Sequence, residues 1–307
     1  MDKRNSLGKR IKQNRVAYIM LLPTIVGFIA FVLYPQLWVL RLAFYKYNGY
    51  TPPVFVGMDN FVRLFTRDTV WWKAVGNTFY FSTAKLLVEI PLALILAVIL
   101  NNNLKGRNLF RTVYFLPNVT STAVMSLVFY FIFSPYQGIL NGILQSIGII
   151  SEPIDWLGQG SLAMIVCMIV SIWQNFGLNM ILFLAGLQSI PDEIYESADI
   201  DGATPVQQFI HLTIPMLGRM LQIILMLAII GSLKTFDLFK VLTNGGPGHD
   251  TEVMMTYIFR YFFVDNMSTT AQPQLGYASS MGLVATIIIG AVTAVYLWMS
   301  RKLEENY

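Results

Sequence analysis

Six long apolar segments dominate this sequence and constrain its fold more than any other feature. Each has 22–25 residues, and a helix needs about 20 residues to cross the hydrocarbon core of a bilayer. The segments are 16–40, 77–100, 112–133, 161–184, 214–236 and 277–298. With 55% hydrophobic and 12% charged residues, the chain has too little polar surface for a soluble protein. We therefore expect an all-α integral membrane protein with six transmembrane helices in a single domain, residues 16–307.

The first apolar segment predicts a membrane span and not a cleaved signal peptide. It is longer than the apolar region of about 7–15 residues in a signal peptide, and no A-x-A-like cleavage site follows it.

The basic residues predict how these helices are oriented. Six of them lie in the N-terminal tail, residues 1–15, and three more follow the second segment at Lys105, Arg107 and Arg111; Arg301 and Lys302 follow the last. Cytoplasmic loops carry the excess of Lys and Arg in membrane proteins. With Arg219 and Lys234 counted at the inner and outer ends of the fifth segment, twelve bases fall on the predicted inside and eight on the outside. Both termini are therefore expected in the cytoplasm, with outside loops at 47–76, 134–160 and 237–276.

Several chemistries are excluded by what the chain lacks. A single cysteine, Cys167, lies in an apolar segment, so neither a disulfide framework nor a thiolate metal cluster can form. His211 and His249 have no ligand-like neighbours, and we expect no metal site and no catalytic residues. The sequence contains no G-x-x-x-x-G-K-[ST] motif for a nucleotide phosphate. Energy must therefore come from an ion gradient or from another subunit.

Polar side chains recur at helical spacing inside two of the apolar segments. One set is Asn118, Thr122 and Ser126; the other is Ser171, Gln174, Asn175 and Asn179. Such spacing places each set on one face of a helix. The presence of any single Ser or Thr in a span is explained by hydrogen bonding to a neighbouring helix. The amides of Gln174 and Asn175 beside Trp173 favour a path for a polyhydroxylated solute.

Lys85 and Glu89 form a pair of opposite charge at i, i+4 within the second segment. Neutralising each other lowers the cost of burying either charge, so the pair suits a structural role. The alternative is a proton or ion relay, which would make the chain a secondary transporter driven by an ion gradient.

The stretch Gly186–Pro215 is acidic, although its predicted location is cytoplasmic. It carries five carboxylates, and no Lys or Arg occurs between Arg111 and Arg219. Pro191 with two following acidic residues favours a helix start, and Asp201-Gly202 predicts a turn. A second helix is expected over Ala203–Leu212, with Pro205 in its first turn and Pro215 at its end. Two helices around a turn, projecting from the membrane, predict a partner-binding surface.

At these residues the chain resembles a known family. Glu196-Ser197-Ala198 followed by Asp201-Gly202-Ala203 is similar to the EAA loop of bacterial binding-protein-dependent ABC importers, with Ser in place of the usual Ala. Further segments resemble carbohydrate-uptake permeases related to the larger permease of the maltose transporter. They are YIMLLPTIVGFIAFVLYP from Tyr18, GMDNFVRLF from Gly57, NTFYFS from Asn77, FRTVYFLPNV from Phe110, FDLFKVLTNGGPGHDTE from Phe236 and GYASSMG from Gly276.

The resemblance implies a type I ABC importer permease in a bacterial cell membrane, surrounded by lipid. Its implied partners are a second permease, two ATPase subunits that bind ATP and Mg, an external solute-binding protein and a sugar or oligosaccharide, with no nucleic acid and no cofactor on this chain. Closure of the ATPase dimer would switch the permease between two packings. Loop 186–213 would couple it to the ATPase through Glu193, Glu196, Ser197, Ala198, Asp201, Gly202, Ala203 and Pro215.

The resemblance also implies a solute path lined from three spans. The matching residues are Asn118, Thr122, Ser171, Gln174, Asn175, Lys234, Thr235 and Asp237. Lys234 and Asp237 put charge where the maltose-type protein has amides. Two explanations stay open: the solute is a charged saccharide, or Lys234 and Asp237 pair with each other.

Overall fold

The computed structural model describes residues 14–102, 104–264 and 271–304, and these are mostly helical. Five of the described helices are long and apolar enough to cross a membrane, and a bent helix pair makes a sixth span if its halves are counted together. The five are Arg15–Leu42, Thr69–Asn101, Gly160–Leu187, Gly218–Leu242 and Leu275–Lys302. The all-α membrane fold is confirmed. Five of the six N-terminal bases, at positions 3–12, lie outside the described residues.

The chain divides into two compact units, which we describe separately. Unit 1 comprises the chain up to Arg67 together with Tyr261–Val284, and unit 2 comprises the remainder. The first span of unit 1 is α2 (Arg15–Phe28), a π-helical turn η1 (Ile29–Leu33) and α3 (Tyr34–Leu42). Its side chains are exposed almost throughout, as expected for an apolar helix that meets lipid or another membrane helix.

The segment after α3 is more ordered than the polar loop predicted there. β1 (Tyr45–Lys46) pairs antiparallel with β2 (Val54–Phe55), and α4 (Asp59–Thr66) follows. Asn60 Nδ2 donates to the carbonyl oxygens of Ala43 and Tyr45, at 2.9 and 3.1 Å, and this holds α4 against the hairpin. The unit continues into the start of α16 (Leu275–Glu304).

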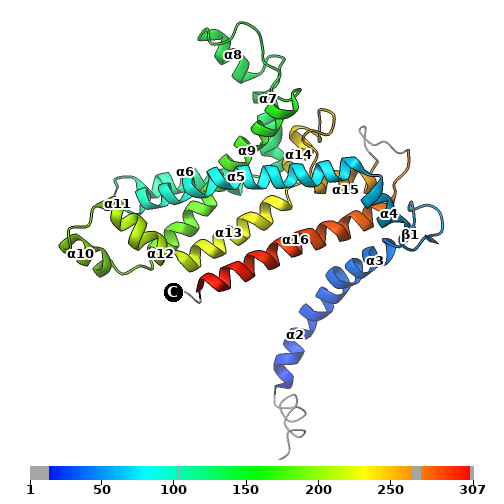
Figure 1. Ribbon diagram of the computed structural model, residues 1–307, viewed down its shortest axis with the longest axis horizontal. Coiled ribbons are helices and arrows are strands. Elements are labelled where there is room, and N and C mark those ends of the chain that lie inside the picture. The colour runs from blue at the N-terminus through cyan, green and yellow to red at the C-terminus, as the bar shows by residue number, and fades with distance from the viewer. Residues whose placement is uncertain (1–13, 103, 265–270, 305–307) are drawn as a thin grey trace, which may run out of the picture. The chain divides into compact units, whose positions relative to one another are not determined.

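Unit 2 is built around two long helices, α5 (Thr69–Asn101) and α9 (Gly160–Leu187). In Figure 1, α6 (Arg107–Val119) and α13 (Gly218–Leu233) accompany them. One buried apolar cluster joins α5, α9 and α13 and includes Ala93, Met180, Phe183 and Ile224. Gly177 allows α6 to approach α9 closely, because a Cβ there would lie 1.9 Å from the Tyr114 carbonyl oxygen.

The predicted straight span 112–133 is replaced by two helices, α6 and α7 (Thr122–Ile132), bent by 95°. Pro117 lies in the last turn of α6 and has no N–H to continue the helical hydrogen bonds, and Thr120 is extended. Asn118 therefore belongs to one helix, whereas Thr122 and Ser126 belong to the next. The prediction that these three side chains share one helix face was wrong.

Helix α5 begins two turns earlier than predicted, at Thr69 instead of Asn77. The Asp68 carboxylate accepts a hydrogen bond of 2.9 Å from the Trp71 amide and caps the helix there. The other two predicted outside loops also contain short helices. They are α8 (Ile139–Ser146) in the second, and α14 (Asp237–Leu242) and α15 (Met254–Phe262) in the third.

The predicted helical hairpin after α9 is present. It comprises α10 (Asp192–Ile200), α11 (Pro205–Gln208), a π-helical turn η2 (Phe209–Thr213) and α12 (Ile214–Met216). Helix α12 passes through Pro215 and ends one residue later, so Pro215 lies within the helix and not at its end. Figure 1 places α10 and α11 at one end of unit 2, and α14 next to the far end of α13.

Candidate functional site

A polar cavity of about 370 Å³ lies halfway along the helices of unit 2. Its walls come from α5, α7, α9, α13 and the start of α14. Seven of the eight residues predicted for a solute path line it: Thr122, Ser171, Gln174, Asn175, Lys234, Thr235 and Asp237. Asn118 does not, since it lies before the bend between α6 and α7.

Hydrogen bonds fix the amides in this cavity. Gln174 Nε2 donates to Thr122 Oγ1 at 3.0 Å and to the Thr120 carbonyl oxygen at 3.4 Å. Asn175 Nδ2 donates to the Ser171 carbonyl oxygen at 2.8 Å. Gln174 thus satisfies a carbonyl that the bend between α6 and α7 leaves without a helical partner. One side chain therefore both holds the bend and lines the cavity.

Lys234 and Asp237 lie at the α13–α14 junction and are both exposed. Within the described part of the chain, neither has an ion-pair partner within 4.0 Å. The mutual ion pair that the sequence left open is therefore not observed. Both charges are available to whatever enters the cavity.

Lys85 and Glu89 line the same cavity, which the sequence did not predict. Lys85 Nζ lies 3.2 Å from Glu89 Oε2, and the side chains are only 5% and 1% exposed. Lys85 Nζ also donates to Ser232 Oγ at 3.2 Å, and Asn179 Nδ2 donates to Glu89 Oε1 at 2.6 Å. The i, i+4 spacing identified the pair, but no sequence signal indicated that α5 faces Asn179 of α9 and Ser232 of α13 here.

The hairpin α10–α11 turns where the sequence predicts it. Gly202 has φ +77°, a conformation that costs glycine little. Its amide donates to the Asp199 carbonyl and the Ala203 amide to the Ala198 carbonyl, the two hydrogen bonds of a Schellman motif. Thr204 then begins α11 with a capping box, in which Gln207 is the reciprocal partner.

Side chains hold the two arms of the hairpin together. Gln208 Nε2 donates to Asp199 Oδ1 at 2.6 Å, and the hydroxyls of Tyr195 and Thr213 are 3.1 Å apart. The inner face of the hairpin, at Ile194 and Tyr195, packs on the cluster below it. The hairpin is therefore a fixed projection of unit 2.

The outer face of the hairpin combines negative charge with apolar side chains. Of the predicted coupling residues, Glu193, Glu196, Ser197, Asp201, Gly202 and Pro215 are exposed, whereas Ala198 and Ala203 are half-buried. Ile200, Val206 and Ile210 are also exposed, Ile200 at 86%. The acidic residues were predicted from the sequence and these apolar ones were not, although exposed apolar side chains on a polar connector are themselves an interface signal.

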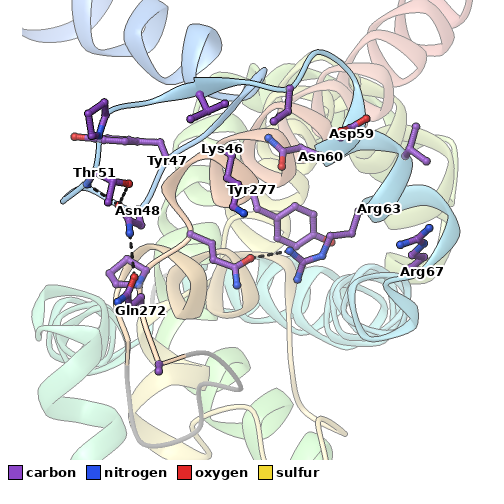
Figure 2. A pocket seen from close by; sticks show the side chains of 17 residues that line it. Lys46, Tyr47, Asn48, Thr51, Asp59, Asn60, Arg63, Arg67, Gln272 and Tyr277 are labelled. Atoms are coloured by element: carbon purple, nitrogen blue, oxygen red, sulfur yellow. Dashed lines mark hydrogen bonds between the residues drawn. The ribbon is translucent and has the colours of Figure 1, made fainter.

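A second cavity, of about 1170 Å³, lies in unit 1 (Figure 2). The Arg63 guanidinium stacks over the Tyr277 ring at 3.9 Å and donates to Gln274 Oε1 at 2.7 Å. Asn48 donates to Gln272 Oε1 at 3.0 Å on another side of the cavity. It is larger than the cavity of unit 2, but none of the residues predicted for a solute path or for coupling lines it.

Neither cavity is built for a metal ion. The described residues contain no group of three or more His, Cys, Asp and Glu side chains that could hold one. His249 contacts Glu252 Oε2 at 3.0 Å, and Cys167 is buried among apolar side chains.

Comparison with known proteins decides the family. Residues 89–306 match the model of the binding-protein-dependent transport system inner membrane component. The chain belongs to this family. It is therefore a transport component and not an enzyme. Membership also favours an importer over the ion-gradient-driven transporter that the Lys85–Glu89 pair had left open.

Relatives match this permease along almost its whole length. It is 35% identical to the probable ABC transporter permease protein YurN of Bacillus subtilis, over 96% of this chain and 100% of that protein. It is also 35% identical to the lactose transport system permease protein LacF of Rhizobium radiobacter, over 97% of this chain and 98% of that one. A chain in the crystal structure of a bacterial alginate ABC transporter, solved with a periplasmic protein bound to an alginate pentasaccharide, superposes with a TM-score of 0.83 at 27% identity, covering 97% and 98% of the two chains.

Proposed function

We propose that this permease is the membrane subunit of an ATP-driven importer for a sugar or oligosaccharide. The observation that carries the proposal is the cavity halfway along the spans, lined by Thr122, Ser171, Gln174 and Asn175. Hydroxyls and amides both donate and accept hydrogen bonds, as a sugar does. The lactose and alginate importers among its relatives act on solutes of this chemistry.

The proposed assembly contains a second permease, two ATPase subunits and an external solute-binding protein, in a bacterial inner membrane. The relative crystallised with its solute-loaded periplasmic protein supports the last of these partners. Both termini and the hairpin α10–α11 then face the cytoplasm, in agreement with the bias of basic residues. ATP and Mg bind to the ATPase subunits, because this chain has no phosphate-binding motif.

The hairpin is proposed to couple the ATPase to the cavity. It is held rigidly to α9 and α13 through the apolar cluster that includes Ile190 and Leu217. A force applied to its exposed face therefore acts on the helices that carry Gln174 and Ser232. ATP-driven closure of the ATPase subunits would bias two packings of these helices and expose the cavity alternately to either side.

Uptake into proteoliposomes tests the proposal. The full importer, with binding protein outside and ATP inside, would be offered radiolabelled lactose, maltose and alginate trisaccharide. We expect ATP-dependent accumulation of at least one of them, lost when the ATPase subunits are omitted and insensitive to ionophores. Accumulation that needs no ATPase and collapses with an ionophore would contradict it.

A further inference from the structure

The cavity of unit 2 contains four charged side chains whose formal charges cancel. Lys85 and Glu89 lie on its α5 wall, and Lys234 and Asp237 lie at its α13–α14 wall. The first two are almost completely buried, whereas the second two are exposed. The cavity is therefore polar and strongly dipolar, yet it has no net charge.

The buried pair retains hydrogen-bonding capacity. A lysine ammonium has three donors and a carboxylate has about four acceptor positions. Glu89 Oε1 accepts from Asn179, and Oε2 lies 3.2 Å from Lys85 Nζ. Each carboxylate oxygen can accept more than one hydrogen bond, so Oε2 can accept one from a ligand in addition to its contact with Lys85.

Lys85 and Glu89 differ from other buried polar residues of α5 in that they line the cavity. Thr78 and Ser82 are also buried, but neither lines the cavity. Thr78 Oγ1 donates to the Ala74 carbonyl and accepts from the Met254 amide, as a residue that joins two segments should. Lys85 and Glu89 instead share the cavity with Gln174 and Asn175 on the facing helix α9.

We propose that Lys85 and Glu89 form a recognition element that contacts the solute and selects uncharged saccharides over acidic ones. This inference rests on the proposed sugar-importer function. A sugar hydroxyl donates to Glu89 Oε2 and accepts from Lys85 Nζ, and both hydrogen bonds are charge-assisted. A uronate carboxylate would meet Glu89 and Asp237, while Lys85 is already neutralised by Glu89. Among the described residues that line the cavity, Lys234 is the one remaining positive charge that would attract the uronate. The negative charge of Asp237, three residues away, offsets this attraction.

The decisive variant replaces both charges, Lys85→Met with Glu89→Leu. Replacing a buried ion pair by apolar residues of similar volume is often neutral or stabilising. If the pair were only structural, the double variant would assemble and transport normally. If the pair is a recognition element, the double variant still assembles and the complex unfolds at the same temperature. Its maximal uptake rate for the neutral probes, however, falls by about a hundredfold.

The single variant Glu89→Gln keeps the shape of the side chain but leaves Lys85 without its counter-charge. Its ratio of alginate trisaccharide uptake to lactose or maltose uptake should rise by roughly tenfold, because the cavity gains a positive charge. Ser82→Ala, on the same helix but outside the cavity, is the matched control and should transport like the parent. Assembly of every variant is checked by co-purification with the ATPase subunits.

The outcomes separate this inference from the proposed function. A parent importer that accumulates no probe contradicts the proposed function and removes the inference with it. A parent that accumulates only the alginate trisaccharide leaves the function in place but overturns the inference. Normal uptake of lactose or maltose by the assembled double variant, or an unchanged acidic-to-neutral ratio in an assembled Glu89→Gln variant, also overturns it.

Discussion

Asn179 donates a hydrogen bond of 2.6 Å to Glu89, from a position 90 residues further along the chain. This bond joins the two central helices of unit 2 at the level of the polar cavity. It also orients a carboxylate that would otherwise have only Lys85 as its partner. Because of this hydrogen bond, one wall of the cavity depends on the packing of α5 against α9. A substitution that weakens this packing should therefore also disturb the polar groups that line the cavity.

Replacing Gly202 by valine should uncouple the permease from its ATPase. The left-handed conformation costs a residue with a Cβ about 1–2 kcal/mol, and more for a β-branched one. No atom lies within 4 Å of the added Cβ, so the effect is on the turn alone. We expect the variant to insert normally and to unfold at a slightly lower temperature, because only the turn is strained, but to lose co-purification with the ATPase. Gly218→Ala is the control, because Gly218 also has open space around an added Cβ but has an ordinary φ. An intact ATPase complex in the Gly202 variant would refute the coupling role.

The exposed Ile200 tests whether the hairpin binds by apolar contact as well as by charge. Full burial of an isoleucine is worth about 1.5–3 kcal/mol, so Ile200→Ser should weaken binding of the ATPase at least roughly tenfold. Thermal unfolding of the isolated permease should not change, since this side chain is 86% exposed. Affinity measured by titrating detergent-solubilised permease with ATPase gives the answer, and equal affinities would assign the interface to the acidic residues.

Gly177 is expected to tolerate no side chain. An added Cβ would lie 1.9 Å from the Tyr114 carbonyl oxygen, so α6 would have to move away from α9. Overpacking of this kind typically costs about 1–3 kcal/mol. Gly177→Ala should lower the thermal unfolding midpoint in detergent by several degrees, whereas Gly290→Ala, with no atom within 4 Å, should leave it unchanged. Equal midpoints would mean that α6 can shift freely.

The buried pair of Glu252 and Arg260 should stabilise the outer part of unit 2. Arg260 Nε donates to Glu252 Oε2 at 2.8 Å, and the two side chains are 4% or less exposed. Arg260→Met leaves the Glu252 charge buried with His249 as its remaining partner among the described residues, a loss of about 3–5 kcal/mol.

The exposed ion pair of Lys73 and Asp250, at 2.5 Å, provides the control for that prediction. Its side chains are 44% and 46% exposed, and pairs of this kind contribute about 0–1 kcal/mol. Lys73→Met should therefore lower the unfolding midpoint far less than Arg260→Met. Similar shifts in the two variants would contradict the assignment of the Glu252–Arg260 pair as a structural element.

The features that the sequence predicts correctly depend on local interactions. Apolar runs long enough to cross a membrane become helical, because backbone groups in lipid must bond within the helix. The turn at Asp201-Gly202 and the helix start at Pro205 follow from the residues themselves. The resemblance of this stretch to the EAA loop therefore coincides with a hairpin that the residues would form independently.

The errors arise where distant parts of the chain meet. Thr112–Phe133 reads as one apolar helix, but Gln174 on α9 supplies the hydrogen bonds that stabilise the break at Thr120. The early start of α5 depends on the side chain of Asp68, which also accepts a hydrogen bond of 2.8 Å from the Tyr257 hydroxyl. In both places a partner far along the chain satisfies backbone or side-chain groups that local propensity leaves open.

Sequence alone therefore determined that this protein is a helical membrane protein with a turn at Gly202, since hydropathy and turn chemistry act over a few neighbouring residues. Only the tertiary structure decided where Lys85 and Glu89 lie. Their spacing identified a pair, but its location in the cavity follows from the packing of α5 against Asn179 and Ser232. Contacts between residues 90 or 147 positions apart leave no periodic trace in the chain, because each partner only has to be polar and in the right place once the helices have packed.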